Sequence, residues 1–182
     1  NQILAEMIPE FEQASNAEEY HLTVAKMVSH LHDAHAVVSS ETLSNYFGLA
    51  SPPVRCRLIE DKVVVTEIIA DTETSLEEGD AIKIGDPIKI GNLIKIGDII
   101  TSIDGIDVKE KFKELSQYYS ASTQASLEHF VVQGILDGAE SIATLGIETG
   151  STGGGKTKFI KLARRIKYKS PEESKDESTD KS

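Results

Sequence analysis

The stretch Leu93-Ile-Lys-Ile-Gly97-Asp98-Ile-Ile-Thr-Ser-Ile-Asp104-Gly105-Ile-Asp-Val108 decides the predicted fold, because its turns and its strand agree with one another. Gly97 can adopt a positive φ without steric cost, so Gly97-Asp98 predicts a tight turn into a strand. The β-branched residues from Ile99 to Ile103 favour a buried strand, and Asp104-Gly105 is a strong signal for a two-residue hairpin turn. The stretch therefore predicts a turn, a strand, a tight turn and a short strand.

The same stretch resembles the central signature of the PDZ domains that are attached to bacterial proteases. The pattern Gly-Asp-x-Ile-x-x-Ile-(Asp/Asn)-Gly-x-x-Val runs here from Gly97 to Val108. The resemblance implies a small β domain that binds peptides. Any hairpin in a small β domain could carry this pattern. The flanking residues therefore have to decide between a PDZ domain and an unrelated small β domain.

The composition is that of an ordinary globular protein with an acidic surface. Of the 182 residues, 39% are hydrophobic and 27% are charged, and the net charge is -11. Residues 1–155 carry about 25 acidic against 10 basic residues, which argues against nucleic acid as the main partner. No apolar run approaches the ~18 residues of a membrane span. Cys56 is the only cysteine, so an internal disulfide is excluded.

Seven basic residues and no acidic ones lie between Lys156 and Lys169. They alternate with the apolar residues Phe159, Ile160, Leu162 and Ile166. We therefore interpret this basic run as the solvated face of a strand.

Two amphipathic helices are predicted at the start of the chain. Apolar side chains recur at helical spacing over residues 2–14. The four residues from Ser15 to Glu18 have the form of a capping box that starts a second helix. The apolar stripe of this second helix runs from Tyr20 to Leu31. The two helices are expected to pack together as a helical cap.

The cluster from His30 to His35 contains three imidazoles and a carboxylate within six residues. Its spacing approaches the His-x-His-x-Asp-His of metallo-β-lactamase-like hydrolases, which would make it a metal site, but here the Asp comes one place early.

A second interpretation starts from Leu31-His-Asp33-Ala-His35, which resembles the Leu-x-Asp-(Gly/Tyr/Ala)-His motif of tail-specific, tricorn-type serine peptidases. That resemblance implies that His35 is the general base for a serine beyond the PDZ domain, with Asp33 as a helix-end or orienting residue. The third interpretation is a set of solvated histidines at the negative end of a helix.

A peptide site is predicted around residues 46–49. This segment has the place of the loop whose backbone N–H groups hold a peptide's terminal carboxylate in PDZ domains. The resemblance implies peptide binding by Phe47, Gly48 and Leu49, together with Phe130 on a helix predicted over residues 122–136. Only one glycine is present and two prolines follow, so a purely structural turn is the alternative.

Two further patterns are typical of other protein classes. Ile-Lys-Ile-Gly occurs three times with a six-residue period between Ile82 and Gly97, which resembles the hexapeptide of the left-handed β-helices in acyltransferases. Three such turns bury too little to stand alone, so we interpret them as a duplicated turn that enlarges the PDZ loop.

Gly150 to Thr157 matches the phosphate-loop pattern, but a phosphate loop must open a helix and the following residues favour a strand. We interpret it as a hairpin loop between strands predicted at 141–149 and 157–167.

Together these patterns predict an α+β protein with a helical region over residues 1–42, a PDZ-like domain with flanking helices and an expanded Gly-Asp loop over 43–168, and a disordered tail or linker over 169–182. By resemblance, the chain is the non-catalytic part of a serine peptidase that binds peptide or protein C-termini or gates a catalytic domain. This interpretation implies no cofactor and no metal, no nucleic-acid partner, no membrane span, a periplasmic or extracellular location and no activity of the chain alone. The alternative function is a stand-alone PDZ-type interaction module unrelated to proteolysis.

Overall fold

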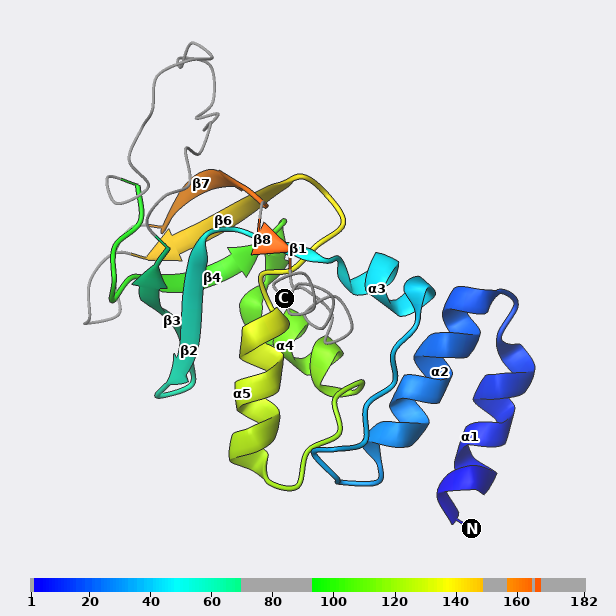
Figure 1. Ribbon diagram of the computed structural model, residues 1–182. Helices are drawn as coiled ribbons and strands as arrows, with labels where there is room; N and C mark the ends of the chain where they lie inside the picture. The colour runs from blue at the N-terminus through cyan, green and yellow to red at the C-terminus, as the bar shows by residue number, and fades with distance from the viewer. Residues whose placement is uncertain (1, 70–92, 149–156, 165, 168–182) are drawn as a thin grey trace, which may run out of the picture.

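The computed structural model describes residues 2–69, 93–148, 157–164 and 166–167 (Figure 1). The helices are α1 (Gln2–Gln13), α2 (Ala17–Ser29), α3 (Glu41–Phe47), α4 (Val108–Ser116) and α5 (Gln124–Gly134). The strands are β1 (Ala50–Ser51), β2 (Val54–Ile59), β3 (Lys62–Ile68), β4 (Ile99–Ile103), β5 (Ile106–Asp107), β6 (Ile142–Glu148), β7 (Thr157–Ala163) and β8 (Ile166–Lys167). The predicted α+β class is confirmed.

An antiparallel sheet with the order β2-β3-β4-β6-β7 forms the body of the molecule, and β5 pairs with β4. Strands β1 and β8 form a separate antiparallel pair. Helices α4 and α5 lie against the sheet, while α1 and α2 stand to one side of it (Figure 1). The core between sheet and helices is made of fully buried aliphatic side chains, which include Val65, Ile100, Ile103, Val131, Ile135, Leu145, Ile147 and Leu162.

The turn before β4 has the predicted form. Gly97 adopts a φ of +92°, and its N–H donates to the carbonyl of Val65 over 2.8 Å. The carboxylate of Asp98 is buried and accepts a hydrogen bond from the N–H of Lys95 over 2.8 Å. The turn is therefore closed by its own aspartate and joined to β3 by its glycine.

The hairpin between β4 and β5 is also confirmed. Asp104 and Gly105 have φ values of 53° and 83°, and Ile103 pairs with Ile106 on either side of them. Two successive positive φ angles are the signature of the turn type that matches the twist of antiparallel strands.

Both N-terminal helices form, but the second begins one residue later than the capping-box prediction. Asn16 is the N-cap, and its side chain accepts the N–H of Glu19 over 2.9 Å. The carboxylate of Glu19 accepts in turn from the N–H of Ser15 over 2.7 Å. The bonds thus differ from a strict capping box, because Glu19 binds the N–H of the residue before the N-cap and not that of Asn16 itself.

Several sequence features fall partly or wholly outside the described residues. The first two copies of the six-residue repeat, most of the Gly150 to Thr157 pattern and the predicted tail are among them. The last repeat copy forms the turn before β4, with Ile94 buried. The strands that the structure describes pair antiparallel throughout, unlike those of a parallel β-helix. The proposed boundary after residue 42 falls within α3.

Candidate functional site

His35 lies on the surface just beyond the end of α2, with its side chain 97% exposed. Its Nδ1 is 3.2 Å from a carboxylate oxygen of Asp33, and its backbone N–H donates to the same oxygen over 2.9 Å. This backbone hydrogen bond and the contact with the ring lower the pKa of the Asp33 carboxyl. Asp33 therefore orients the imidazole through one ring nitrogen, while the ring stays open to a partner.

The segment that carries His35 is fixed to the loop before α5. The N–H of Asp33 donates to the hydroxyl of Ser120 over 3.0 Å, and the N–H of Ala34 donates to the hydroxyl of Ser122 over 3.2 Å. His32 adopts a φ of 52°, which turns the chain after the helix. Within the described ranges, no three His, Cys, Asp or Glu side chains are gathered so that they could hold a metal ion.

A mostly apolar groove of about 380 Å³ lies between α2, α3 and α5, and it is called the groove below. Its described lining comes from α2, the segment 34–40, the end of α3, the segment 118–120, α5 and the turn after α5. The residues that line it are Ala25, Val28, Ala34, Ala36, Val37, Val38, Ser39, Ser40, Leu43, Ser44, Phe47, Gly48, Leu49, Tyr118, Tyr119, Ser120, Phe130 and Asp137. The fold thus brings Phe47, Gly48, Leu49 and Phe130 to one surface, although Phe130 is more than 80 residues away along the chain.

The segment predicted as a carboxylate-binding loop is the end of a helix. Ser40 caps α3 by accepting the N–H of Leu43, and its hydroxyl also lies 2.8 Å from Nδ1 of His21. At the other end, the N–H of Gly48 donates to the carbonyl of Ser44 over 2.9 Å. Helix formation by residues 41–47 therefore uses the glycine N–H that the loop interpretation assigned to a ligand.

Aromatic packing holds this end of α3 in place. The ring of Phe47 makes a T-shaped contact with the ring of Tyr118, at 5.6 Å between centroids. The hydroxyl of Tyr46 donates to Glu114 on α4 over 3.1 Å, and burial with this bond raises the pKa of Tyr46 to about 12. The wall of the groove that contains Phe47 is thus tied to the helices on the sheet.

Gly48 packs directly against the turn after α5. It has a φ of +82°, and a Cβ built on it would lie 2.1 Å from the carbonyl carbon of Gly138. The N–H of Gly138 donates to the carbonyl of Ala50 over 3.3 Å. Gly138 itself lies four residues beyond the end of α5 at Gly134. A Cβ built on Gly138 would lie 2.5 Å from the guanidinium carbon of Arg164, so the absence of a side chain at this position leaves room for that guanidinium.

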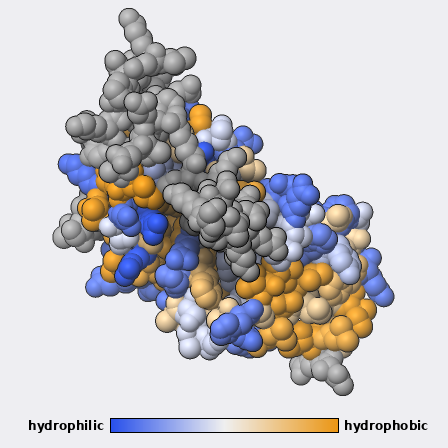
Figure 2. Space-filling model, in the orientation of Figure 1, coloured by the Kyte–Doolittle hydropathy of each residue, from blue (hydrophilic) through white to orange (hydrophobic). Residues whose placement is uncertain are grey.

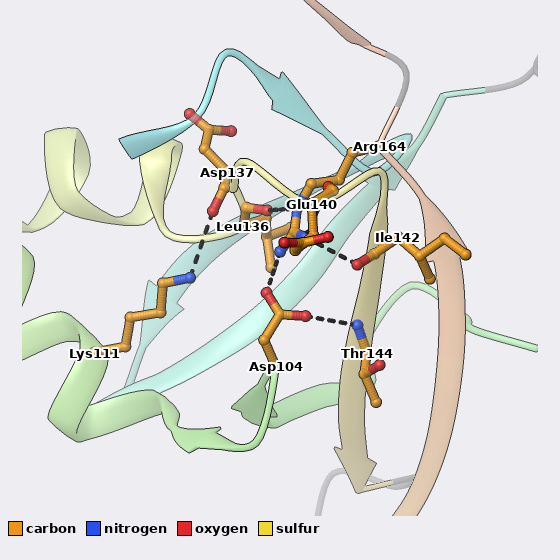
Figure 3. Close-up of polar contacts among 8 residues, drawn as sticks. All are labelled: Asp104, Lys111, Leu136, Asp137, Glu140, Ile142, Thr144 and Arg164. Atoms are coloured by element: carbon orange, nitrogen blue, oxygen red, sulfur yellow. Dashed lines mark hydrogen bonds and ion pairs between the residues drawn. The ribbon is translucent and has the colours of Figure 1, made fainter. Parts of the chain in front are cut away.

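A buried arginine, Arg164, binds the backbone of this turn from the interior of the protein (Figure 3). The side chain of Arg164 is fully buried, and its guanidinium donates to the carbonyls of Leu136 and Ile142 over 3.1 and 3.0 Å. It also donates to the carbonyl of Glu140 and forms an ion pair with the carboxylate of Asp104. Arg164 therefore holds both sides of the turn that follows α5.

The basic-run interpretation is wrong for Arg164, although Lys161 in the same run is exposed as expected. The signal that could have revealed the burial of Arg164 is the alternation of apolar and polar residues along this strand. Ile160 and Leu162 are buried, and a strand's two-residue period places residue 164 on the same inward side. A charged residue at such a position requires a partner of opposite charge, which Asp104, with its side chain 34% exposed, provides from the hairpin turn.

Asp137 is the functional candidate that sequence reasoning missed. It lines the groove, and its Oδ1 is buried without a hydrogen-bond partner among the described residues. Burial raises the pKa of Asp137 to about 7, against the opposing effects of a hydrogen bond from Ser51 and the charges of Lys111 and Arg164. Lys111 donates to the backbone carbonyl of Asp137 over 3.4 Å (Figure 3). No motif marks this residue, because its environment comes from four separate segments.

Apolar surface gathers over the N-terminal helices (Figure 2). Ile3, Leu4, Ile8, Tyr20 and Leu31 are large apolar side chains that are at least 36% exposed, and only Met7 among the described residues of α1 is buried. Within the described part of the chain, no helix has the length and apolar content that a membrane crossing requires.

Comparison with known proteins shows a shared fold. No family model and no curated protein matches the chain. Crystal structures of mature CPAF, a chlamydial serine protease, alone and in complex with lactacystin, are similar, each with a TM-score of 0.55 at 17% identity. A structure of a CPAF mutant gives 0.53 at 16% identity. Each match covers 90% of this chain but only 28% of the protease, so the chain spans less than a third of these neighbours.

Proposed function

We propose that this chain is the non-catalytic N-terminal and PDZ-like part of a serine peptidase, and that its groove captures a peptide segment. The observation that carries the proposal is the gathering of Phe47, Gly48, Leu49 and Phe130 along one apolar groove. A volume of about 380 Å³ with mostly apolar lining suits apolar peptide side chains. The protease-related fold supports the wider assignment.

In this proposal His35 serves as the general base for a serine that the chain itself does not supply. The support is geometric, because a carboxylate on one ring nitrogen orients the imidazole and leaves the exposed ring able to accept a proton. The serine would belong to a catalytic domain, and the apolar surface over the N-terminal helices is suited to dock it. Docking there would allow this chain to deliver a captured peptide to the active site, or to gate access to it.

Amide NMR titration of the whole chain with an apolar peptide tests the capture. We expect shifts at Phe47 to Leu49 and near Phe130. Leu49→Lys should weaken binding by about tenfold or more, because Leu49 is 50% exposed in the groove and a lysine there places a charge in an apolar site.

Ile106→Lys is the matched control, since Ile106 is 42% exposed on the β4–β5 hairpin and does not line the groove. This variant should bind like the unmodified chain. Equal loss in both variants, or shifts that avoid the groove, would contradict capture at this place.

A further inference from the structure

We infer that the groove accepts an apolar segment from within a polypeptide, and that Asp137 excludes a free carboxyl terminus from it. This inference rests on the proposed function and names the class of ligand. It departs from the expectation of C-terminal capture, for the three reasons that follow.

The first reason is the charge of the lining. Among the described residues that line the groove, Asp137 is the only Asp, Glu, Lys, Arg or His. A ligand carboxylate would therefore find an acid in the groove and no ammonium, guanidinium or imidazole to pair with. Burying a carboxylate without a partner is costly, so an uncharged segment is the better complement.

The second reason is the direction of the backbone dipoles at Phe47 and Gly48. The last turn of α3 ends here, and the C-terminal end of a helix carries partial negative charge from its carbonyl groups. The N–H of Gly48 is already bonded to Ser44. The groove thus presents a negative helix end where C-terminal capture requires several N–H donors.

The third reason is that the two cations near Asp137 already have partners within the protein. Lys111 faces it from α4 and Arg164 from the end of β7, and neither residue lines the groove. Arg164 is paired with Asp104, and Lys111 is bonded to the carbonyl of Asp137. These two cations are matched by two acids, Asp104 and Asp137, which leaves no surplus positive charge for a ligand. Tyr119 is a further titratable group beside Asp137 on the groove side.

The test uses three peptides of one apolar sequence, all acetylated at the amino end. The first ends in an amide, the second in a free acid, and the third in a free acid after a Gly-Ser extension of four residues. Isothermal titration of the whole chain at pH 8 should show the amide and the extended acid binding about equally. The short acid should bind about fivefold more weakly or worse, as expected for two like charges at close range.

The pH dependence identifies Asp137 as the cause. Its pKa is raised to about 7, so the carboxyl is largely protonated at pH 5.5 and ionised at pH 8. The preference for amide over short acid should therefore be smaller at pH 5.5, where only the end of α3 and the lack of a cation oppose the acid, and should grow as the pH rises. Asp137→Asn, an isosteric change, should give this smaller preference at both pH values. Since the pH series needs only the unmodified chain, the test does not depend on this variant folding.

The outcomes separate this inference from the proposed function. If the short acid binds as tightly as the amide at pH 8, or more tightly, the exclusion is refuted while peptide capture stands. If none of the three peptides binds, capture itself is refuted and the inference with it.

Discussion

At the scale of single residues, the ion pair between Arg164 and Asp104 has the clearest consequences. The Arg164 side chain is fully buried, and its donors reach three carbonyls and one carboxylate. Asp104 in turn accepts the N–H of Thr144 over 2.8 Å, so its carboxylate joins the hairpin turn to β6. Loss of the guanidinium would remove the donor from the carbonyls of Leu136, Glu140 and Ile142 and the ion-pair partner from Asp104.

We expect Arg164→Met to lower the free energy of unfolding by about 2–4 kcal/mol, because buried carbonyls such as that of Leu136 lose their donors. Arg164→Lys should recover little, because a single ammonium cannot reproduce the planar set of donors. Urea denaturation of the purified variants measures both effects.

Arg55→Met is the control for this prediction. Arg55 is 3.7 Å from Glu67, but both side chains are more than half exposed. A surface pair contributes at most about 1 kcal/mol, so this variant should unfold nearly as the original chain does. A loss of less than about 1 kcal/mol for Arg164→Met would show that the buried pair contributes little.

At the scale of elements, the packing of the α3 end on the turn after α5 depends on Gly48, and Gly105 of the β4–β5 hairpin is its natural comparison. Gly48 and Gly105 have almost the same backbone angle, with φ values of 82° and 83°. A Cβ on Gly48 would strike the backbone of Gly138, whereas a Cβ on Gly105 meets no atom within 4 Å. The two positions therefore separate backbone strain from steric contact.

Gly105→Ala should cost about 1–3 kcal/mol, the usual range for a side chain held at positive φ. Gly48→Ala should cost clearly more, because the added methyl group must also push the α5–β6 turn away from α3. Thermal unfolding compares the two variants. An equal loss of stability in both would mean that the contact between Gly48 and Gly138 yields without cost.

At the scale of the whole molecule, the arrangement separates the groove from an exposed histidine. The groove lies between α2, α3 and α5, while His35 lies on the segment between α2 and α3 with Asp33 beside its ring. A molecule of this kind would supply binding and a base, and a second domain would supply the nucleophile.

We therefore expect the chain alone to remain unlabelled by a fluorophosphonate probe and not to hydrolyse casein, under conditions in which an active serine peptidase is labelled. Intact-mass spectrometry measures the labelling. Stoichiometric labelling that is lost in His35→Ala would place the nucleophile within this chain and overturn the division of labour proposed here.

Local chemistry alone determined the turn at Gly97, the hairpin at Asp104-Gly105, the two N-terminal helices and the β6–β7 pair. Each of these depends on residues that are neighbours in the chain, through positive φ angles, caps or a short hydrophobic period. The α+β class follows from the same signals. Peptide binding by Phe47, Gly48 and Leu49 stays a prediction, and the helix that ends at Phe47 was not predicted, although Ser40 caps its start.

Tertiary structure alone decided the burial of Arg164, the approach of Gly48 to Gly138 and the position of Asp137 in the groove. Arg164 and Asp104 are 60 residues apart, and neither has a local partner that would announce the pair. Asp137 acquires its raised pKa from burial among segments that the sequence separates. Charge and hydrogen-bonding environments depend on distances in space, so the position of Asp137 in the groove became visible only once the chain was folded.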